Sequence, residues 1–322
     1  MNVKSRVRIG ALVGATALAL GALAVPAQAD VPPGEYRVLA GVGSDTTQDV
    51  FNGLGNAVAG GDLIASYNAT GTTTIKTRAT NCEIPRPNGS SAGINALRNA
   101  VDNNTGCLDF ARSSRGVNND STTDLTWIPF AKDAVTFAVR GDSDLPTALT
   151  TQQLTDIYTC DLDELNGVAL TPLLPQAGSG TRSFFLGALG LTEDTFGPCV
   201  DDTVQEHNGE ELDSEGDIAP YSIAQYIAQG NQPGDVIDRR GFSVLGSVDG
   251  AQPTLADGKL NTAFPFNRDV YNVVPTENLD LPNIEAAFVT GNSLVCDQDA
   301  VIEEYGFGTV ANCGSTVLKG ES

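Results

Sequence analysis

Apolar runs and segments with helical spacing of apolar residues follow one another along this chain. Near-continuous apolar runs predict strands, at residues 36–43, 62–70, 107–114, 131–140, 170–176, 239–250 and 264–275. Apolar residues recurring every three or four positions predict helices, at residues 46–60, 90–103, 149–167, 177–190 (after a glycine turn), 220–230, 281–291 and 297–305. Thr150 or Thr151, with a Gln two or three residues later, predicts the N-cap of the helix at 149–167. Strands alternating with helices predict an α/β fold with mostly parallel sheets.

The N-terminus has the pattern of a cleavable signal peptide. Lys4, Arg6 and Arg8 precede an apolar run, which ends in Ala27-Gln28-Ala29, the small-x-small pattern cleaved by signal peptidase. We expect residues 1–29 to be removed and the mature protein to be secreted or periplasmic; an uncleaved membrane anchor is the alternative. No Cys lies near the cleavage site and the C-terminus is polar, so we expect no lipid anchor and no membrane insertion.

The chain is strongly acidic. It has 322 residues, with 40 Asp and Glu against 18 Lys and Arg, and a net charge of −22. The charges of the signal peptide are all basic, so the mature chain is more acidic still. Nucleic acids require cationic partners, so we expect none to bind. High net charge favours a soluble monomer, and the length suits two domains or one large one.

The six cysteines predict disulfides. An even count in an exported protein indicates three bridges, although six cysteines allow 15 pairings. The cysteines fall into three local pairs, which predict Cys82–Cys107, Cys160–Cys199 and Cys296–Cys313. A Cys/His zinc site is disfavoured because there is no CxxC and only one histidine, and we expect no metal.

Four turns rich in glycine or hydroxyl residues follow predicted strands, at residues 41–47, 70–74, 112–116 and 176–183. Oxyanions bind at helix N-termini, where free N–H groups and a partial positive charge meet. Glycine permits close approach of the backbone, and Ser or Thr adds a hydroxyl donor. Gly178-Ser179-Gly180-Thr181 is the strongest of these elements, and it lacks the Gly-Lys-Ser/Thr of a nucleotide P-loop. The four turns together predict a site for a small oxyanion.

At these turns the chain resembles the phosphate-binding component of bacterial phosphate ABC transporters, a family with the type II periplasmic-binding-protein fold. The opening Gly-x-Gly-x turn of that family is similar to residues 41–44, and its Tyr-x-x-x-Gly-Ser-Ser turn is loosely similar to residues 67–73. Its Asp-Phe-Gly-x-Ser-Asp strand end is similar to residues 109–114, and its Gly-Ser-Gly-Thr helix start is intact at residues 178–181.

The resemblance implies two lobes that close on one dehydrated anion without chemistry or cofactor. One lobe would use residues 30–130 and 260–322, the other residues 131–259. The ligand would be phosphate and the partner an ABC permease. The implied binding residues, by position, are Ser44, Asp45, Thr46, Thr72, Thr73, Ser113, Ser114, Ser179, Gly180 and Thr181.

Two positions depart from the family pattern. The binding Asp of the family falls on Ser114, and its Arg falls on Pro175. Arg182, Arg112 or Arg115 would have to supply the charge, since an anion buried without a cation is costly. Hydroxyl donors without an acceptor carboxylate suit sulfate about as well as phosphate, whereas Asp45 near the ligand would favour phosphate.

Two other classes of function compete with anion capture. A hydrolase would need His207, the sole histidine, as its base. We expect His207, with Glu206, Glu210 and Glu211, on a solvated acidic surface, and we therefore predict no catalytic residues. A secreted adhesion or cell-wall interaction protein on the same scaffold is the second alternative, favoured by the lack of an anchor.

Overall fold

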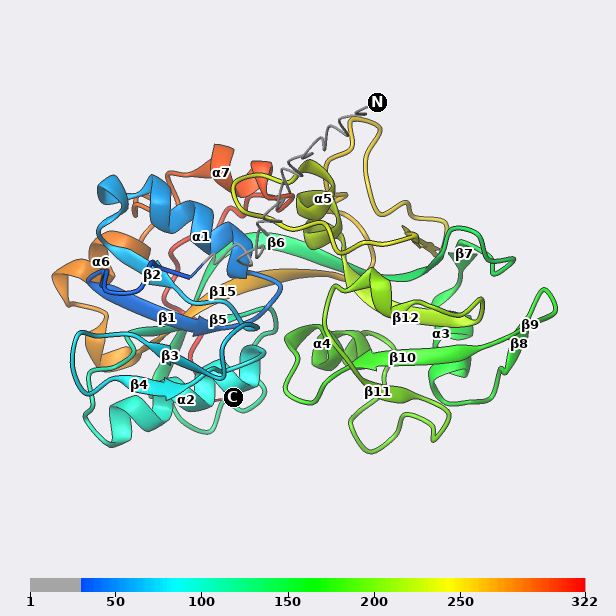
Figure 1. Cartoon of the computed structure of the whole chain (residues 1–322), viewed down its shortest axis with the longest axis horizontal. Coiled ribbons are helices and arrows are strands. Elements are labelled where there is room, and N and C mark those ends of the chain that lie inside the picture. The colour runs from blue at the N-terminus through cyan, green and yellow to red at the C-terminus, as the bar shows by residue number, and fades with distance from the viewer. Residues whose placement is uncertain (1–29, 322) are drawn as a thin grey trace, which may run out of the picture.

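The computed structural model describes residues 30–321, so the predicted signal peptide lies outside the described residues. Its helices and strands form two groups (Figure 1), which we call the first and second lobes. The first lobe contains β1 (Leu39–Gly43), α1 (Gln48–Ala57), β2 (Ile64–Ser66), β3 (Thr74–Lys76), β4 (Glu83–Pro85), α2 (Ser90–Asp102), β5 (Phe110–Ser113), α6 (Pro282–Phe288) and α7 (Asp299–Glu304). The second contains β7 (Ala148–Leu149), α3 (Thr151–Tyr158), β8 (Glu164–Leu165), β9 (Val168–Ala169), β10 (Thr171–Pro175), α4 (Gly180–Ala188), β11 (Asp201–Val204), β12 (Asp217–Ser222), β13 (Ser243–Leu245) and β14 (Ser247–Val248).

Two long strands, β6 (Leu125–Arg140) and β15 (Asn267–Pro275), connect the lobes. They pair antiparallel in one sheet of order β11-β10-β12-β6-β15-β5-β1-β2, with β13 added at β6. On either side of this central pair the sheet is parallel, through β1 with β2 and β5 in the first lobe and β10 with β11 and β12 in the second. The α/β class predicted from the alternating pattern is confirmed.

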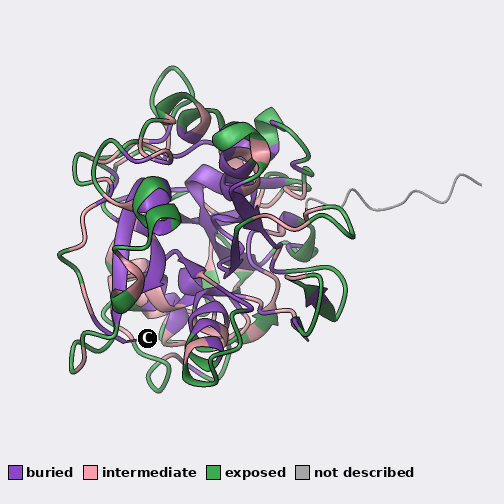
Figure 2. Cartoon of the chain, turned by 90° about the vertical axis from the view of Figure 1, so that its left-hand side faces the viewer, coloured by how far each residue is buried: buried purple, intermediate pink, exposed green. Residues whose placement is uncertain are grey.

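Helix α5 (Ile223–Asn231) lies where the lobes meet. Its residues Ala224 and Ala228 pack into the first core with Phe51. In return, Leu260 and Phe264, from the segment before β15, pack into the second core. The hydrophobic core of each lobe therefore includes apolar side chains from a segment outside the helices and strands of that lobe. Figure 2 shows the buried sheet in the interior with the more exposed helices and loops around it.

Several elements differ from their predicted bounds. The helix predicted at 149–167 ends at Tyr158, because a β8–β9 hairpin uses the residues beyond; its capping box of Thr150 and Gln153 is present. The helix predicted at 220–230 starts only at Ile223, because Pro220–Ser222 pair with β6 and the Ser222 hydroxyl caps α5. The acidic segment after Cys199, where no strand is predicted, contains β11.

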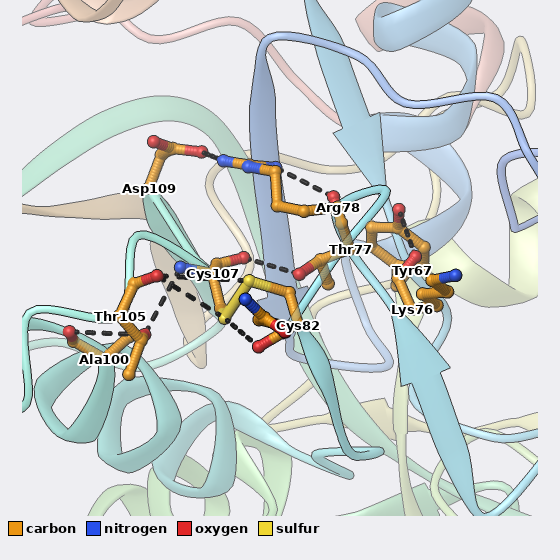
Figure 3. Close-up of a disulfide and its surroundings, with 10 residues drawn as sticks. Tyr67, Lys76, Thr77, Arg78, Cys82, Ala100, Thr105, Cys107 and Asp109 are labelled. Atoms are coloured by element: carbon orange, nitrogen blue, oxygen red, sulfur yellow. Dashed lines mark hydrogen bonds and ion pairs between the residues drawn. A yellow bond between two sulfur atoms is a disulfide. The ribbon is translucent and has the colours of Figure 1, made fainter.

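All three predicted disulfides are present: Cys82–Cys107, Cys160–Cys199 and Cys296–Cys313. Figure 3 shows the first of these, with the Thr77 hydroxyl donating to the Cys107 carbonyl beside it. The bridge joins the end of the β3–β4 hairpin to the segment between α2 and β5. Within residues 30–321 no helix is long and apolar enough to cross a membrane, and no group of three or more His, Cys, Asp or Glu is placed to hold a metal ion.

Candidate functional site

Three helices begin at one place between the lobes. α1 follows the turn after β1, α2 follows Gly89, and α4 follows Gly178. Gly89 and Gly178 have φ of 104° and 87°, a region that favours glycine. A Cβ on Gly89 would lie 2.6 Å from the Gly178 carbonyl oxygen, and the Ser91 N–H donates to that oxygen at 3.2 Å. The N-terminal turns of α2 and α4, from different lobes, are therefore in direct contact.

Hydroxyl side chains line this contact. The Thr46 and Thr181 Oγ1 atoms, from different lobes, lie 3.1 Å apart. The Ser114 N–H donates to Ser90 Oγ at 3.1 Å, and a Cβ on Gly180 would lie within 2.3 Å of both the Ser90 and Ser114 hydroxyls. We call Thr46, Ser90, Ser114, Ser179 and Thr181 the hydroxyl cluster; all are buried. Helix N-termini and hydroxyls give this cluster the donors that an oxyanion requires.

The cationic group at this cluster is Arg268, on β15. Its guanidinium donates to Asp133 Oδ2 from Nε at 3.0 Å and from Nη2 at 2.8 Å. Nη2 also donates to Thr181 Oγ1 at 3.0 Å. Asp133 is held in turn by the Ser222 hydroxyl and the Ala224 N–H, through Oδ1. The pair is buried and hydrogen-bonded on both sides, so the guanidinium is fixed against the hydroxyl cluster.

Glu206 and His207 follow β11 and enter the same cluster. Glu206 Oε2 lies 3.4 Å from Thr46 Oγ1 and 3.3 Å from His207 Nε2, while no described residue donates to Oε1. Burial opposes ionisation of this carboxyl, but hydrogen bonds from His207 and Ser179 and the charge of Arg268 hold the pKa of Glu206 below its usual value. Glu206 is therefore a buried carboxylate whose Oε1 can still accept a hydrogen bond.

The expectation that His207 and Glu206 lie on a solvated surface is wrong. Their exposed fractions are 2% and 0%. The chain bends at His207, whose φ of 53° is uncommon outside glycine, and this turn carries both side chains inward. Glu210 and Glu211, in the short 3₁₀ turn that follows, do lie at the surface.

Hydrogen bonding fixes the tautomer of His207. The Ser222 N–H points at Nδ1 at 3.2 Å, so Nδ1 is an acceptor and the ring proton is on Nε2. Nε2 lies 3.0 Å from Thr46 Oγ1 and donates rather than accepts there. A general base must accept the proton of the nucleophile, so this arrangement does not activate Thr46.

The remaining residues predicted to bind the ligand are distributed as follows. Ser44 and Asp45 are buried in the β1–α1 turn, and Asp45 accepts from Gln205 Nε2 at 2.7 Å. Ser113 bonds to the backbone of Arg115 instead of facing the hydroxyl cluster. Thr72 and Thr73 are exposed, and Thr72 accepts from Arg86.

The three arginines named as charge donors make other contacts. Arg112 is buried against the carbonyls of Tyr67 and Ser44. Arg182 pairs with Glu193 and Asp202. Arg115 donates to Ser91 Oγ and to the Gly116 carbonyl. Arg268, which was not among the three, is the arginine that donates to Thr181 of the hydroxyl cluster.

Sequence reasoning missed four residues of the site: Ser90, Glu206, His207 and Arg268. Ser90 had a usable signal, since Gly89-Ser90-Ser91 opens a predicted helix in the same way as the other turns. Arg268 had none, because it lies within a strand and meets Asp133 across 135 residues.

The fold and site together define a two-lobed α/β solute-binding protein, with its hydroxyl cluster where the lobes meet. The model of the PBP superfamily domain matches residues 31–289, and the chain belongs to this superfamily. A search of the curated proteins found no match.

Many solved structures are similar to the chain, among them the following three. One, assigned as a phosphate ABC transporter substrate-binding protein with bound phosphate, from Clostridium perfringens, has a TM-score of 0.60 at 17% identity, covering 84% of this chain and 99% of that one. An ABC-type phosphate transport receptor from Vibrio cholerae has a TM-score of 0.57 at 19% identity, with coverages of 84% and 100%. A phosphate-binding protein from Stenotrophomonas maltophilia has a TM-score of 0.51 at 12% identity, with coverages of 86% and 91%. These similarities establish a shared fold.

Proposed function

We propose that this protein captures a small inorganic oxyanion, phosphate in preference to sulfate, between its lobes and releases it unchanged. One observation carries the proposal: three helix N-termini and five buried hydroxyl residues from both lobes meet at one point beside Arg268. Dipolar donors of this kind hold an anion in a dehydrated site, where each hydrogen bond is strong. Thr46, Ser90, Ser114, Ser179, Gly180 and Thr181 would contact the anion, and Arg268 would supply the charge.

Glu206 is the reason to place phosphate first. Its carboxylate is ionised and Oε1 has no donor among the described residues. At neutral pH phosphate still carries a proton that it can donate to this oxygen, whereas sulfate has none and would be repelled by the buried charge. The binding Asp of the resembled family falls on Ser114 in this chain, and Glu206, from a different loop, would take its place. Similar structures described as phosphate transport receptors support the same ligand.

The protein would be exported by its signal peptide, act as a monomer without cofactor, and deliver its ligand to an ABC permease. We propose no catalysis, because His207 holds its proton on the atom that faces Thr46.

Isothermal titration calorimetry with phosphate and sulfate tests the proposal. The wild-type protein should bind phosphate saturably in the micromolar range or tighter, and sulfate more weakly. E206Q should lose about tenfold to a hundredfold in phosphate affinity, the usual value of a hydrogen bond to a charged group, and should gain affinity for sulfate. E210Q, which changes an exposed carboxylate four residues away, should match the wild type. Failure of the wild-type protein to bind either anion would exclude the proposal.

A further inference from the structure

Arg115 is a buried cation without an anionic partner among residues 30–321. It follows β5 and is 3% exposed. Its guanidinium donates to the Gly116 carbonyl at 3.0 Å and to Ser91 Oγ at 2.9 Å, and Nε has no acceptor in the described part of the chain. None of the described residues forms an ion pair with it, and burial alone lowers the pKa of Arg115 to about 10. One face of the guanidinium lies 5.6 Å from the centre of the Trp127 ring.

Other buried arginines of the described chain are compensated. Arg268 pairs with Asp133 at 2.8 Å and Arg182 with Asp202 at 3.0 Å. Arg112 donates to backbone carbonyls and lies near the charges of several aspartates. Because an isolated buried charge is costly, such a group is normally paired. The cation at Arg115 lacks this compensation, and a negatively charged ligand would provide it.

A cavity of about 540 Å³ adjoins Arg115. Segments from different parts of the fold line it: residues 115–118, residues 183–184 and 187–188 of α4, and residues 265–267. The lining is mixed: Val117, Phe184 and Phe266 are among its apolar members, and its polar members are Arg115, Asn118, Ser183 and Asn267. This volume is in the range of sites for small organic molecules and exceeds what one inorganic ion needs.

The cavity is separate from the hydroxyl cluster. Phe184 lines the cavity, while the Arg268 guanidinium lies 5.2 Å from the centre of the Phe184 ring and donates to Thr181 in the cluster. The Arg268 guanidinium and the Phe184 ring therefore lie between the cavity and the hydroxyl cluster. A ligand in the cavity would touch α4 of the second lobe and the loop after β5 of the first.

We propose that this cavity is a second binding site, for a small organic carboxylate with an apolar body whose carboxylate pairs with Arg115. The planar fork of a guanidinium matches a carboxylate through two parallel hydrogen bonds, and the phenylalanine walls receive the apolar part. The proposal is independent of anion capture at the hydroxyl cluster. Because the ligand contacts both lobes, it also favours their closed arrangement and raises the affinity for phosphate.

Calorimetric titration with benzoate, and with its uncharged analogue benzamide, tests the site. Benzoate should bind saturably and benzamide at least about tenfold more weakly, because it lacks the charge that Arg115 requires. Trp127, the sole tryptophan of the chain, is buried under Arg115, so its emission should change in proportion to the heat of binding. R115M should weaken benzoate binding by about tenfold or more, while R98M, an exposed arginine on α2, should not.

A second variant keeps the test valid if R115M fails to fold. Gly187 lines the cavity, and a Cβ there meets no atom within 4 Å. G187F should fill the cavity, abolish benzoate binding and leave phosphate binding and thermal unfolding unchanged. Equal binding of benzoate and benzamide, no saturable binding of benzoate, or unchanged benzoate binding in G187F would overturn the second site. Phosphate titration of the same samples reports separately on the hydroxyl cluster.

Discussion

Arg268 connects the stability of the protein to its proposed ligand, and R268M separates the two. Methionine keeps much of the volume but removes the charge and all the donors. In the wild-type protein, Asp133 Oδ2 accepts two hydrogen bonds from Arg268, while Oδ1 accepts from Ser222 and Ala224. R268M leaves Oδ2 of a fully buried carboxylate without a donor. Breaking a buried ion pair on one side costs about 3–5 kcal/mol, and we expect a loss in this range.

The double variant D133N/R268M is the matched control. An asparagine can keep the bonds to Ser222 and Ala224 and carries no charge, so the remaining cost should fall to about 1–3 kcal/mol for imperfectly paired amide groups. Both variants should lose at least about tenfold in phosphate affinity, because neither has the cation beside Thr181. Chemical denaturation gives the free energy of unfolding, and calorimetry gives the affinity.

Two results would contradict this reasoning. If R268M lowered the free energy of unfolding by less than about 1 kcal/mol, the pair would not be buried as described. If the double variant bound phosphate like the wild-type protein, Arg268 would not be the charge that holds the anion, and Arg115 would become the next group to test.

Three further changes have definite expected outcomes. Asp49 is buried beside Asp45, and burial together with this like charge raises the pKa of Asp49 from 3.8 to about 6. The free energy of unfolding of the wild-type protein should therefore fall by about 3 kcal/mol as the pH rises from below 4 to above 6. Chemical denaturation of D49N across this range should show a smaller loss, and an equal loss would refute the raised pKa. G180A should weaken phosphate binding because its methyl group meets the Ser90 and Ser114 hydroxyls across the lobes, whereas G187A should bind as the wild type does in the same calorimetric assay. R182M should lower the thermal unfolding temperature but keep phosphate affinity, since its partners are Glu193 and Asp202; lost affinity would return Arg182 to the site.

The sequence predicted best what depends on neighbours in the chain. The Thr150–Gln153 capping box and the three disulfides, which close loops of 17 to 39 residues, follow from local spacing. So does the Gly178–Thr181 turn, which opens α4. Local pattern also misled, because an acidic composition made Glu206 and His207 look solvated. Their burial depends on partners far along the chain, such as Thr46 and Ser222.

Local spacing also failed to predict which arginine reaches the hydroxyl cluster. Arg112, Arg115 and Arg182 lie at or beside the predicted turns and were named for that reason, whereas Arg268 lies within a predicted strand and was not. Only the pairing of β15 with β6 brings Arg268 to Asp133, in the register that sets the two residues directly opposite each other. The register between distant strands depends on the whole sheet and cannot be predicted from the local spacing of residues.

The length of β6 has a consequence for how this protein folds. The strand runs unbroken from Leu125 to Arg140 and is almost entirely buried; it pairs with β15 over residues 125–134 and with β12 and β13 over residues 135–140. The boundary expected between residues 130 and 131 falls inside it. A fragment ending there would leave each half with an unpaired, apolar sheet edge, a template for aggregation. The two lobes should therefore unfold as one cooperative unit and resist expression as separate halves.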